Sequence, residues 1–211
     1  TPRDPSVGRW RVVDCARDQQ GILSIVAGLF TAFGVDVERA DVFTIDAASG
    51  ETGDRTPRRA RSRTKSSRAT PDRPTALDIF DVTISGDNRD LPWPEIERDL
   101  RRYVRKLADG DIDGVREEVV DRVSSVLGRS DARDGGLLAP AVVEVQDDED
   151  GATRLSIRSG DTPGFLFAFA NALTALGVNI RRAEARTVGD EALDTFWVTE
   201  PGGGPIVGPG R

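Results

Sequence analysis

The sequence contains no histidine, no methionine, one cysteine and only two lysines among its 29 basic residues. The missing histidines exclude His-based catalytic triads and every metal site that uses imidazole ligands. One cysteine excludes an internal disulfide and a thiolate zinc site, and is typical of a reducing compartment. We therefore expect a cytoplasmic chain with no metal and no cofactor.

Long apolar runs are also missing. No stretch approaches the ~20 apolar residues of a membrane helix, and the chain does not open with a signal peptide. A formal net charge of −7 argues against nucleic acid as a main partner, so we expect neither DNA nor a membrane. The absence of methionine, with Thr1 as the first residue, indicates a processed or excised piece of a longer chain. Cys15 lies in an apolar run and is expected to be buried.

The 211 residues suit one large or two small domains. Alternating or continuous apolar runs predict strands at 10–15, 35–45, 76–85, 141–146, 153–158 and 192–198, and a further strand is expected to start at Asn179. Apolar positions at helical spacing predict helices at 21–33, 94–107, 112–127 and 165–173. The strands at 141–146 and 153–158 are expected to form a hairpin across a polar turn.

Residues 47–75 differ from the rest, because Gly, Ser, Thr, Pro and Arg dominate and large apolar side chains are almost absent. Such a segment cannot bury enough surface to offset its ordering entropy, so we expect a disordered basic insertion. A tolerated surface loop is one interpretation of it. A basic arm that binds RNA, a membrane or an acidic partner is the other.

An internal repeat organises the chain. With an offset of 143 residues, Asp18 aligns with Asp161, Gly21 with Gly164 and Gly34 with Gly177, and after the insertion the offset becomes 116. Each copy has the order strand, loop, helix, strand, strand. Helices and the strand at 141–146 follow the first copy and complete a β-α-β-β-α-β plan.

The predicted fold class is therefore α+β, with two ferredoxin-like βαββαβ repeats, of which the second lacks its last helix and strand. The predicted boundaries are residues 9–146 for the first domain, which contains the insertion at 47–75, and 153–200 for the second, truncated domain. Residues 1–8 and 201–211 are expected to be tails.

The motifs of the second copy resemble the ACT domain. They are the runs Asp161–Leu166, Leu176–Ile180 and Ala192–Thr199. In tandem, the two copies are similar to the C-terminal regulatory region of the bacterial P-II protein uridylyltransferases, the bifunctional uridylyltransferase and uridylyl-removing enzymes. The first copy departs from the pattern, since Gln20 replaces the usual Pro and Asp36 replaces the Asn.

This resemblance implies allosteric regulation. ACT domains bind small effectors, most often amino acids, at the loop before the first helix and at interfaces between paired domains. For the uridylyltransferase group the implied effector is glutamine, and the implied partner is an attached catalytic region or another ACT domain. The Gly-Ser nucleotidyltransferase loop and the His-Asp region of that family are missing, so this chain is not expected to transfer or remove nucleotides by itself. A parent protein would be a uridylyltransferase-like enzyme of nitrogen regulation.

The candidate ligand-binding residues surround the start of each copy's first helix. A glycine there lets the backbone approach a ligand, and the unpaired N–H groups of the first turn can hold a carboxylate. The aspartate before the glycine either accepts a ligand ammonium or caps the helix. The candidates are Asp161, Thr162, Pro163, Gly164, Phe165, Asn179 and Ile180, with Asp18 and Gly21 in the first copy.

Asn179 is expected to lie next to the loop at 161–165, where its amide can pair with a ligand carboxylate or amide; a structural turn asparagine is the alternative. Asp36, at the equivalent position, would repel a carboxylate, which makes the first copy the poorer site. A module that has kept the ACT fold for protein interaction or dimerisation, without a ligand, is the competing hypothesis.

Overall fold

The structure is a computed structural model that describes residues 3–4, 9–45, 74–84, 91–134, 141–147 and 151–207. The expected basic insertion at 47–75 lies outside these ranges except for its last two residues, so its role stays a prediction. In the described part of the chain, no helix is long and apolar enough to cross a membrane.

Two β-α-β-β units account for most of the molecule. The first consists of β2 (Arg9–Arg17), α1 (Ile22–Ala32), β3 (Val35–Ile45) and β4 (Thr75–Ile84). The second consists of β6 (Thr153–Gly160), α4 (Phe165–Ala175), β7 (Asn179–Val188) and β8 (Glu191–Thr199). The remaining elements are β1 (Arg3–Asp4), α2 (Trp93–Ala108), α3 (Ile112–Asp134) and β5 (Val142–Asp147).

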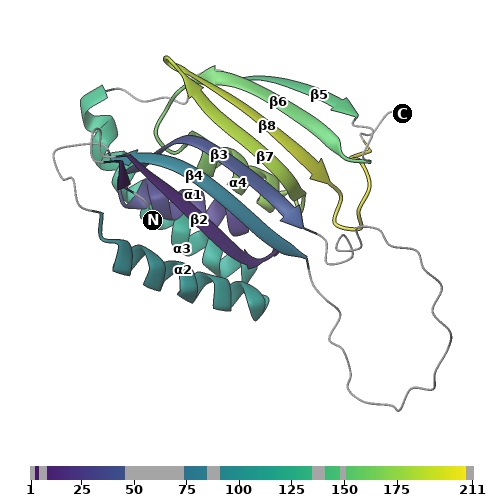
Figure 1. Cartoon of the computed structure of the whole chain (residues 1–211), viewed down its shortest axis with the longest axis horizontal. Coiled ribbons are helices and arrows are strands. Elements are labelled where there is room, and N and C mark those ends of the chain that lie inside the picture. The colour runs from purple at the N-terminus through teal and green to yellow at the C-terminus, as the bar shows by residue number, and fades with distance from the viewer. Residues whose placement is uncertain are drawn as a thin grey trace, which may run out of the picture.

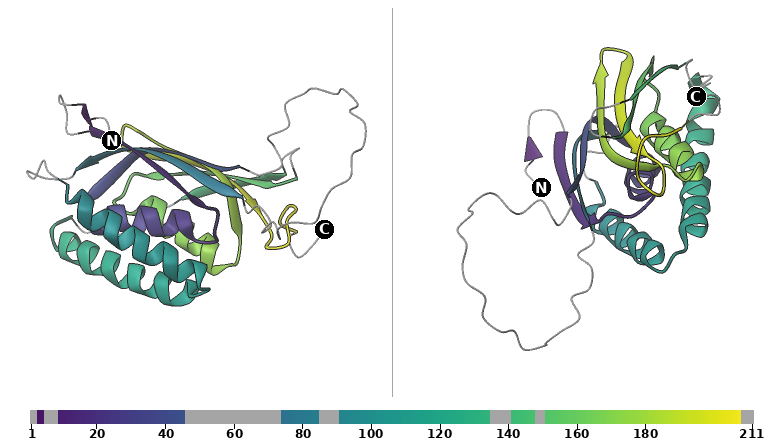
Figure 2. Two further views of the ribbon diagram at one scale, coloured as in Figure 1. Left: turned by 60° about the horizontal axis from the view of Figure 1, so that its bottom comes forward. Right: turned by 90° about the vertical axis from the view of Figure 1, so that its right-hand side faces the viewer.

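All the strands join one antiparallel sheet in the order β1-β2-β4-β3-β7-β8-β6-β5. The helices cover one face of this sheet and leave the other face open (Figures 1 and 2). The buried core lies between the two layers, where strand residues such as Phe80 and Phe196 are fully buried. This α+β arrangement confirms the predicted ferredoxin-like repeats.

The two units meet at the pairing of β3 with β7. Asp41 lies opposite Glu184 in this register, and these two residues occupy equivalent positions of the repeat, 143 residues apart. The neighbouring pairs are related by the same symmetry, since Ala40 lies opposite Ala185 and its counterpart Ala183 lies opposite Val42. The junction therefore has a pseudo-two-fold axis, which relates the strands, the helix and the loop of one unit to their counterparts in the other.

The helices follow the same symmetry. A Cβ atom added at Gly21 would lie 3.1 Å from Thr174, and one added at Gly164 would lie 3.1 Å from Thr31. In equivalent bonds, Thr31 Oγ1 donates to the carbonyl of Ala27 and Thr174 Oγ1 donates to that of Ala170. The start of each unit's helix thus packs against the end of the other unit's helix.

Strand β5 corrects one expectation. The strand at 141–146 was expected to complete the first unit, but β5 pairs with β6 along its whole length, with Val143 opposite Ile157. It therefore occupies the position of the fourth strand of the second unit, and the predicted hairpin with β6 is confirmed. The periodicity identified a strand correctly but could not specify its partner, because pairing partners are not encoded in local alternation.

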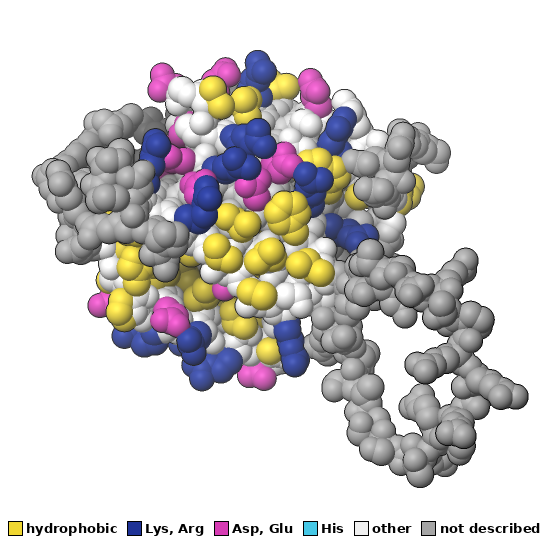
Figure 3. Space-filling model, in the orientation of Figure 1, with side chains coloured by type: hydrophobic (Ala, Val, Ile, Leu, Met, Phe, Trp, Pro, Cys, Tyr) yellow, Lys and Arg dark blue, Asp and Glu magenta, His cyan; other side chains and the backbone are white. Residues whose placement is uncertain are grey.

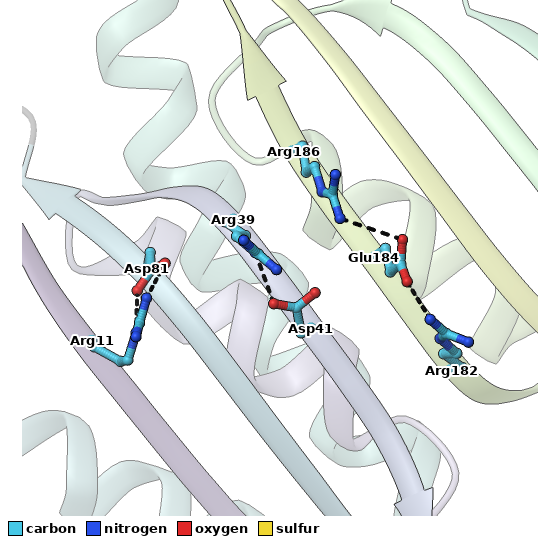
Figure 4. Close-up of polar contacts among 7 residues, drawn as sticks. All are labelled: Arg11, Arg39, Asp41, Asp81, Arg182, Glu184 and Arg186. Carbon is cyan, nitrogen blue, oxygen red and sulfur yellow. Dashed lines mark hydrogen bonds and ion pairs between the residues drawn. The ribbon is translucent and has the colours of Figure 1, made fainter.

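The open face of the sheet carries a band of charged side chains next to a group of hydrophobic ones (Figure 3). Close to the junction, Arg39 pairs with Asp41 at 2.8 Å, while Arg182 and Arg186 both pair with Glu184 (Figure 4). These arginines offset the repulsion between two carboxylates that face each other across the strand pair.

Cys15 also lies on the open side. It is exposed, which contradicts the expected burial, because β2 alternates and Cys15 shares the phase of the exposed Val13.

Candidate functional site

A glycine in the left-handed region precedes α1 and α4. Gly21 has φ 89° and Gly164 has φ 79°, a conformation that an L side chain adopts only with strain. Each glycine turns the chain from its strand into its helix and leaves the first N–H groups of the helix facing away from the helix body. Two equivalent loops, 18–24 and 161–167, therefore present helix starts at the junction of the units.

A cavity of about 400 Å³ lies at the loop of the first unit. We call it the first cavity. Its wall combines that loop with the start of β7 from the second unit, and Thr199 and Gly203 close one side. Its lining residues include Asp18, Gln19, Gly21, Ser24, Asn179 and Arg181. Its volume lies in the range of small-molecule sites, roughly 300–1,000 Å³.

Hydrogen bonds fix the loop of the first cavity in place. Thr44 Oγ1 donates to Asp18 Oδ2 at 2.9 Å, and the Asp18 N–H donates to the carbonyl of Pro74 at 2.9 Å. Gln20 Nε2 donates to the carbonyl of Thr174 in α4 at 3.4 Å. The loop is therefore held from both units, which orients the Asp18 carboxylate.

The polar groups of the first cavity suit a zwitterion. Asp18 supplies a negative charge, Arg181 a positive one, and Asn179 an amide. The positive end of the α1 dipole can also bind a carboxylate. Gln19 Oε1 is buried and has no hydrogen-bond partner among the described residues, so it offers an acceptor to a ligand N–H group.

The equivalent place in the second unit is nearly closed. This second cavity has a volume of about 30 Å³ and is lined by Asp36, Asp161, Thr162, Gly164, Phe165 and Phe167, among others. Burial raises the pKa of Asp36 above its ordinary value, and the neighbouring charge of Asp161 raises it further. Two carboxylates at one small opening disfavour a ligand carboxylate.

Side-chain size explains the difference between the two cavities. Ser24 of the first loop corresponds to Phe167 of the second, and Ile22 corresponds to Phe165. Phe167 is buried and reaches Gly28 of α1, so its ring occupies space that the smaller Ser24 leaves open. Asn179, the counterpart of Asp36, belongs to the open cavity.

The structure divides the predicted site residues between the two cavities. Asp18 and Gly21 line the first cavity together with Asn179 and Ile180. Asp161, Thr162, Gly164 and Phe165 line the second cavity, and Pro163 is exposed beside it.

The expected grouping of Asn179 with the loop at 161–165 is therefore wrong. The pseudo-two-fold axis places the β7 start of one unit beside the loop of the other. For the same reason Asp36 lies beside Asp161 and not beside Asp18. The larger cavity and the Asn179 amide therefore occur together, at the loop of the first unit.

Sequence reasoning missed several lining residues. Thr44 reaches Asp18 only through the strand register, and Thr174 reaches Gly21 only through the packing of α4 on α1. The repeat itself held a usable signal, because Ser24 aligned with Phe167 indicates unequal space at the two loops.

A buried aspartate lies behind each loop. Asp78 of β4 is 1% exposed and Asp194 of β8 is 4% exposed. Burial raises the pKa of Asp78 to about 7, with contributions from Asp14 and Asp18. Burial likewise raises the pKa of Asp194 to about 7, with a contribution from Asp161. Both carboxyl groups therefore titrate near neutral pH.

A protein-family model described as the ACT domain matches residues 153–206. These residues include the whole second unit: its loop, its helix and its three strands. The second unit is an ACT domain. The ACT domain thus supplies Asn179 to the first cavity and the loop of the second cavity.

Comparison of the whole chain gives relatives that are all called bifunctional uridylyltransferase/uridylyl-removing enzyme. The Nitrobacter winogradskyi protein is 35% identical over 216 residues, which covers 99% of this chain and 19% of the relative. The Streptomyces coelicolor protein is 28% identical over 194 residues, covering 90% of this chain and 19% of the relative. The Rhodospirillum rubrum protein is 27% identical over 205 residues, which covers 97% of this chain and 18% of the relative.

The chain thus spans about a fifth of the length of the curated relatives it matches. The similarity extends across both units, and not only across the ACT domain of the second. No solved structure gives a significant match.

Proposed function

We propose that this chain is an amino-acid-sensing regulatory region, with glutamine as the foremost ligand and with the first unit acting as a second ACT domain in tandem. The first cavity carries this proposal, because it combines adequate volume with Asp18, Asn179 and the start of α1. Its walls come from both units, so a ligand there bridges them. The cytoplasmic location stays a prediction, as do the boundaries at 9–146 and 153–200, except that the strand at 141–146 pairs with the second unit.

The ligand is oriented by charge. Its carboxylate lies at the N-terminal turn of α1. The Ile22 N–H already donates to the carbonyl of Gln19, so the next N–H groups of the turn, which lack intrahelical partners, and the helix dipole favour negative charge there. Its ammonium lies beside Asp18, whose Oδ2 already accepts the Thr44 hydroxyl. A side-chain amide, as in glutamine, pairs with the Asn179 amide, which can both donate and accept.

Occupancy is then passed to an attached catalytic region. The names of the relatives support a uridylyltransferase-type nucleotidyltransferase as that region, and a role in nitrogen regulation is what the family resemblance implies. A ligand that contacts both units favours one relative arrangement of them, and this differential affinity is what shifts a regulated equilibrium.

Asn179→Asp tests the site. We expect glutamine affinity to fall by about tenfold or more, because the carboxylate loses the N–H donor that pairs with the carbonyl of the ligand amide and adds a second negative charge to the cavity beside Asp18. Isothermal titration calorimetry of the two proteins gives the ratio of dissociation constants. Asp36→Asn is the matched control, since it makes the reciprocal change at the second cavity and leaves the first unaltered.

The competing function is a protein-interaction module without a ligand. The closed second cavity favours it for that half of the junction. If a folded sample gives no heat with any of the common amino acids, the sensor function is rejected and the interaction module takes its place. An unchanged glutamine affinity in Asn179→Asp would reject the first cavity as the site.

A further inference from the structure

Asp78 is a buried acid that makes none of the proposed contacts with the ligand. It lies on β4 opposite Asp14 of β2 and opposite Val42 of β3. Its side chain is 1% exposed, and neither carboxylate oxygen has a hydrogen-bond partner in the described part of the chain. Burying a carboxyl group without partners strongly disfavours its charged form.

Among the described residues, no cation compensates the charge of Asp78. Helix α1, which packs over this face of the sheet, contains no charged residue, and β3 presents Val42. The charges that act on Asp78 are those of Asp14 and Asp18, and both are negative. Asp78 therefore responds to any change of charge at Asp18.

Asp78 is also adjacent to the first cavity. Ala76, two residues along β4 and on the same face, lines the cavity, as do Val42 and Asp18. A positive group bound beside Asp18 acts on the Asp78 carboxyl group as the charge of Asp18 does but with the opposite sign, and the burial of Asp78 strengthens that interaction.

We propose that the first cavity is a proton-linked site, in which an amino-acid ammonium bound beside Asp18 releases the proton of Asp78 to solvent. The inference rests on the proposed function, since it requires that an amino acid binds there. Binding and deprotonation then favour each other, and the affinity for the ligand rises with pH through the neutral range.

The direction of this linkage follows from the charges. The free protein holds a proton on Asp78 because burial and two neighbouring carboxylates raise its pKa to about 7. A bound ammonium stabilises the ionised form and so lowers that pKa. The complex therefore binds fewer protons than the free protein near neutral pH, and affinity increases as pH rises.

Asp194 supplies a matched control within the same molecule. It occupies the equivalent position of the second unit, is 4% exposed, and has a pKa that burial raises to about 7. Its neighbouring loop borders the closed second cavity. Asp194 lines that small cavity and not the first one, so it shares the burial of Asp78 away from the proposed ligand site.

Calorimetric titration of this chain with glutamine tests the proposal. Near neutral pH, the heat should depend on the ionisation enthalpy of the buffer and show proton release. Affinity should rise by about threefold to tenfold between roughly pH 6 and pH 8. Asp78→Asn should remove both effects while still binding glutamine, and Asp194→Asn should keep both.

Binding heat that is independent of the buffer overturns the proton linkage but leaves the sensor function intact. Proton release that persists in Asp78→Asn overturns the role of Asp78. The absence of any heat rejects the sensor function itself and the linkage with it. The buffer dependence is measured on the unmodified chain, so the test stands even if Asp78→Asn fails to fold.

Discussion

Replacing Asp78 by asparagine stabilises the folded chain at neutral and basic pH, by about 2–4 kcal/mol near pH 8. The native carboxyl group is buried with no partner among the described residues for either oxygen. Above its pKa of about 7 the folded state must hold a buried charge, whereas the unfolded chain exposes that charge to water. Asparagine has no charge to bury, so its advantage appears where the aspartate is ionised.

The sign of the pH dependence is fixed by the direction of the pKa shift. The pKa of Asp78 in the folded state, about 7, lies above the ordinary value of 3.8. The contribution of Asp78 to the free energy of unfolding is most favourable below pH 3.8, the ordinary pKa, and is lost as pH rises through about 7. The difference between the two proteins should therefore be small near pH 4 and greatest near pH 8.

Urea denaturation at about pH 4.5 and at about pH 8 measures this difference. Asp113→Asn is the control, because the Asp113 side chain is 87% exposed, and we expect a change within about 0.5 kcal/mol at both pH values. An equal effect of Asp78→Asn at the two pH values, or a loss of stability near pH 8, would contradict the account.

Gly28→Ala and Gly128→Ala should change stability in opposite directions. A Cβ atom at Gly28 would lie 2.4 Å from Val119 Cγ1 of α3 and 2.8 Å from Phe167 Cδ2 of α4. Val119 is 2% exposed and Phe167 is 7% exposed, so neither can move into solvent. We expect Gly28→Ala to lower the free energy of unfolding by about 1–3 kcal/mol through overpacking.

Gly128 is the matched site. It is an exposed helical glycine on α3, and a Cβ there would meet nothing within 4 Å. The same substitution should raise stability by up to about 1 kcal/mol, because alanine is the better helix former. Denaturant unfolding of the pair gives both values, and a stabilising Gly28→Ala would contradict the close packing of α1 between α3 and α4.

Much of the fold could be predicted because its signals are local. Apolar periodicity identified the helices, and the offset of 143 residues between the two copies identified the two units. The assignment of β5 failed because a strand's partner depends on contacts distant in sequence. The alternation of β4 also contained an unused signal, since Asp78 lies in phase with the buried Ala76, Phe80 and Val82 and is therefore expected on the core face.

The candidate site was predicted residue by residue but not as an assembly. Asp18, Gly21, Asn179 and Ile180 were all named, and the structure brings them together at the first cavity. The sequence alone placed Asn179 with the wrong loop, because the correct grouping requires the pairing of β3 with β7. Local motifs identify the residue types of a site, whereas the pseudo-two-fold axis decides which residues meet.

Hydrogen–deuterium exchange with and without glutamine tests the central claim most directly. The two loops are equivalent in fold, so the molecule contains its own internal comparison. We expect slower exchange at residues 18–24 and 178–181 on addition of glutamine, with no change at 161–167 and 35–37. Protection confined to 161–167 and 35–37, or no protection at either loop, would contradict it.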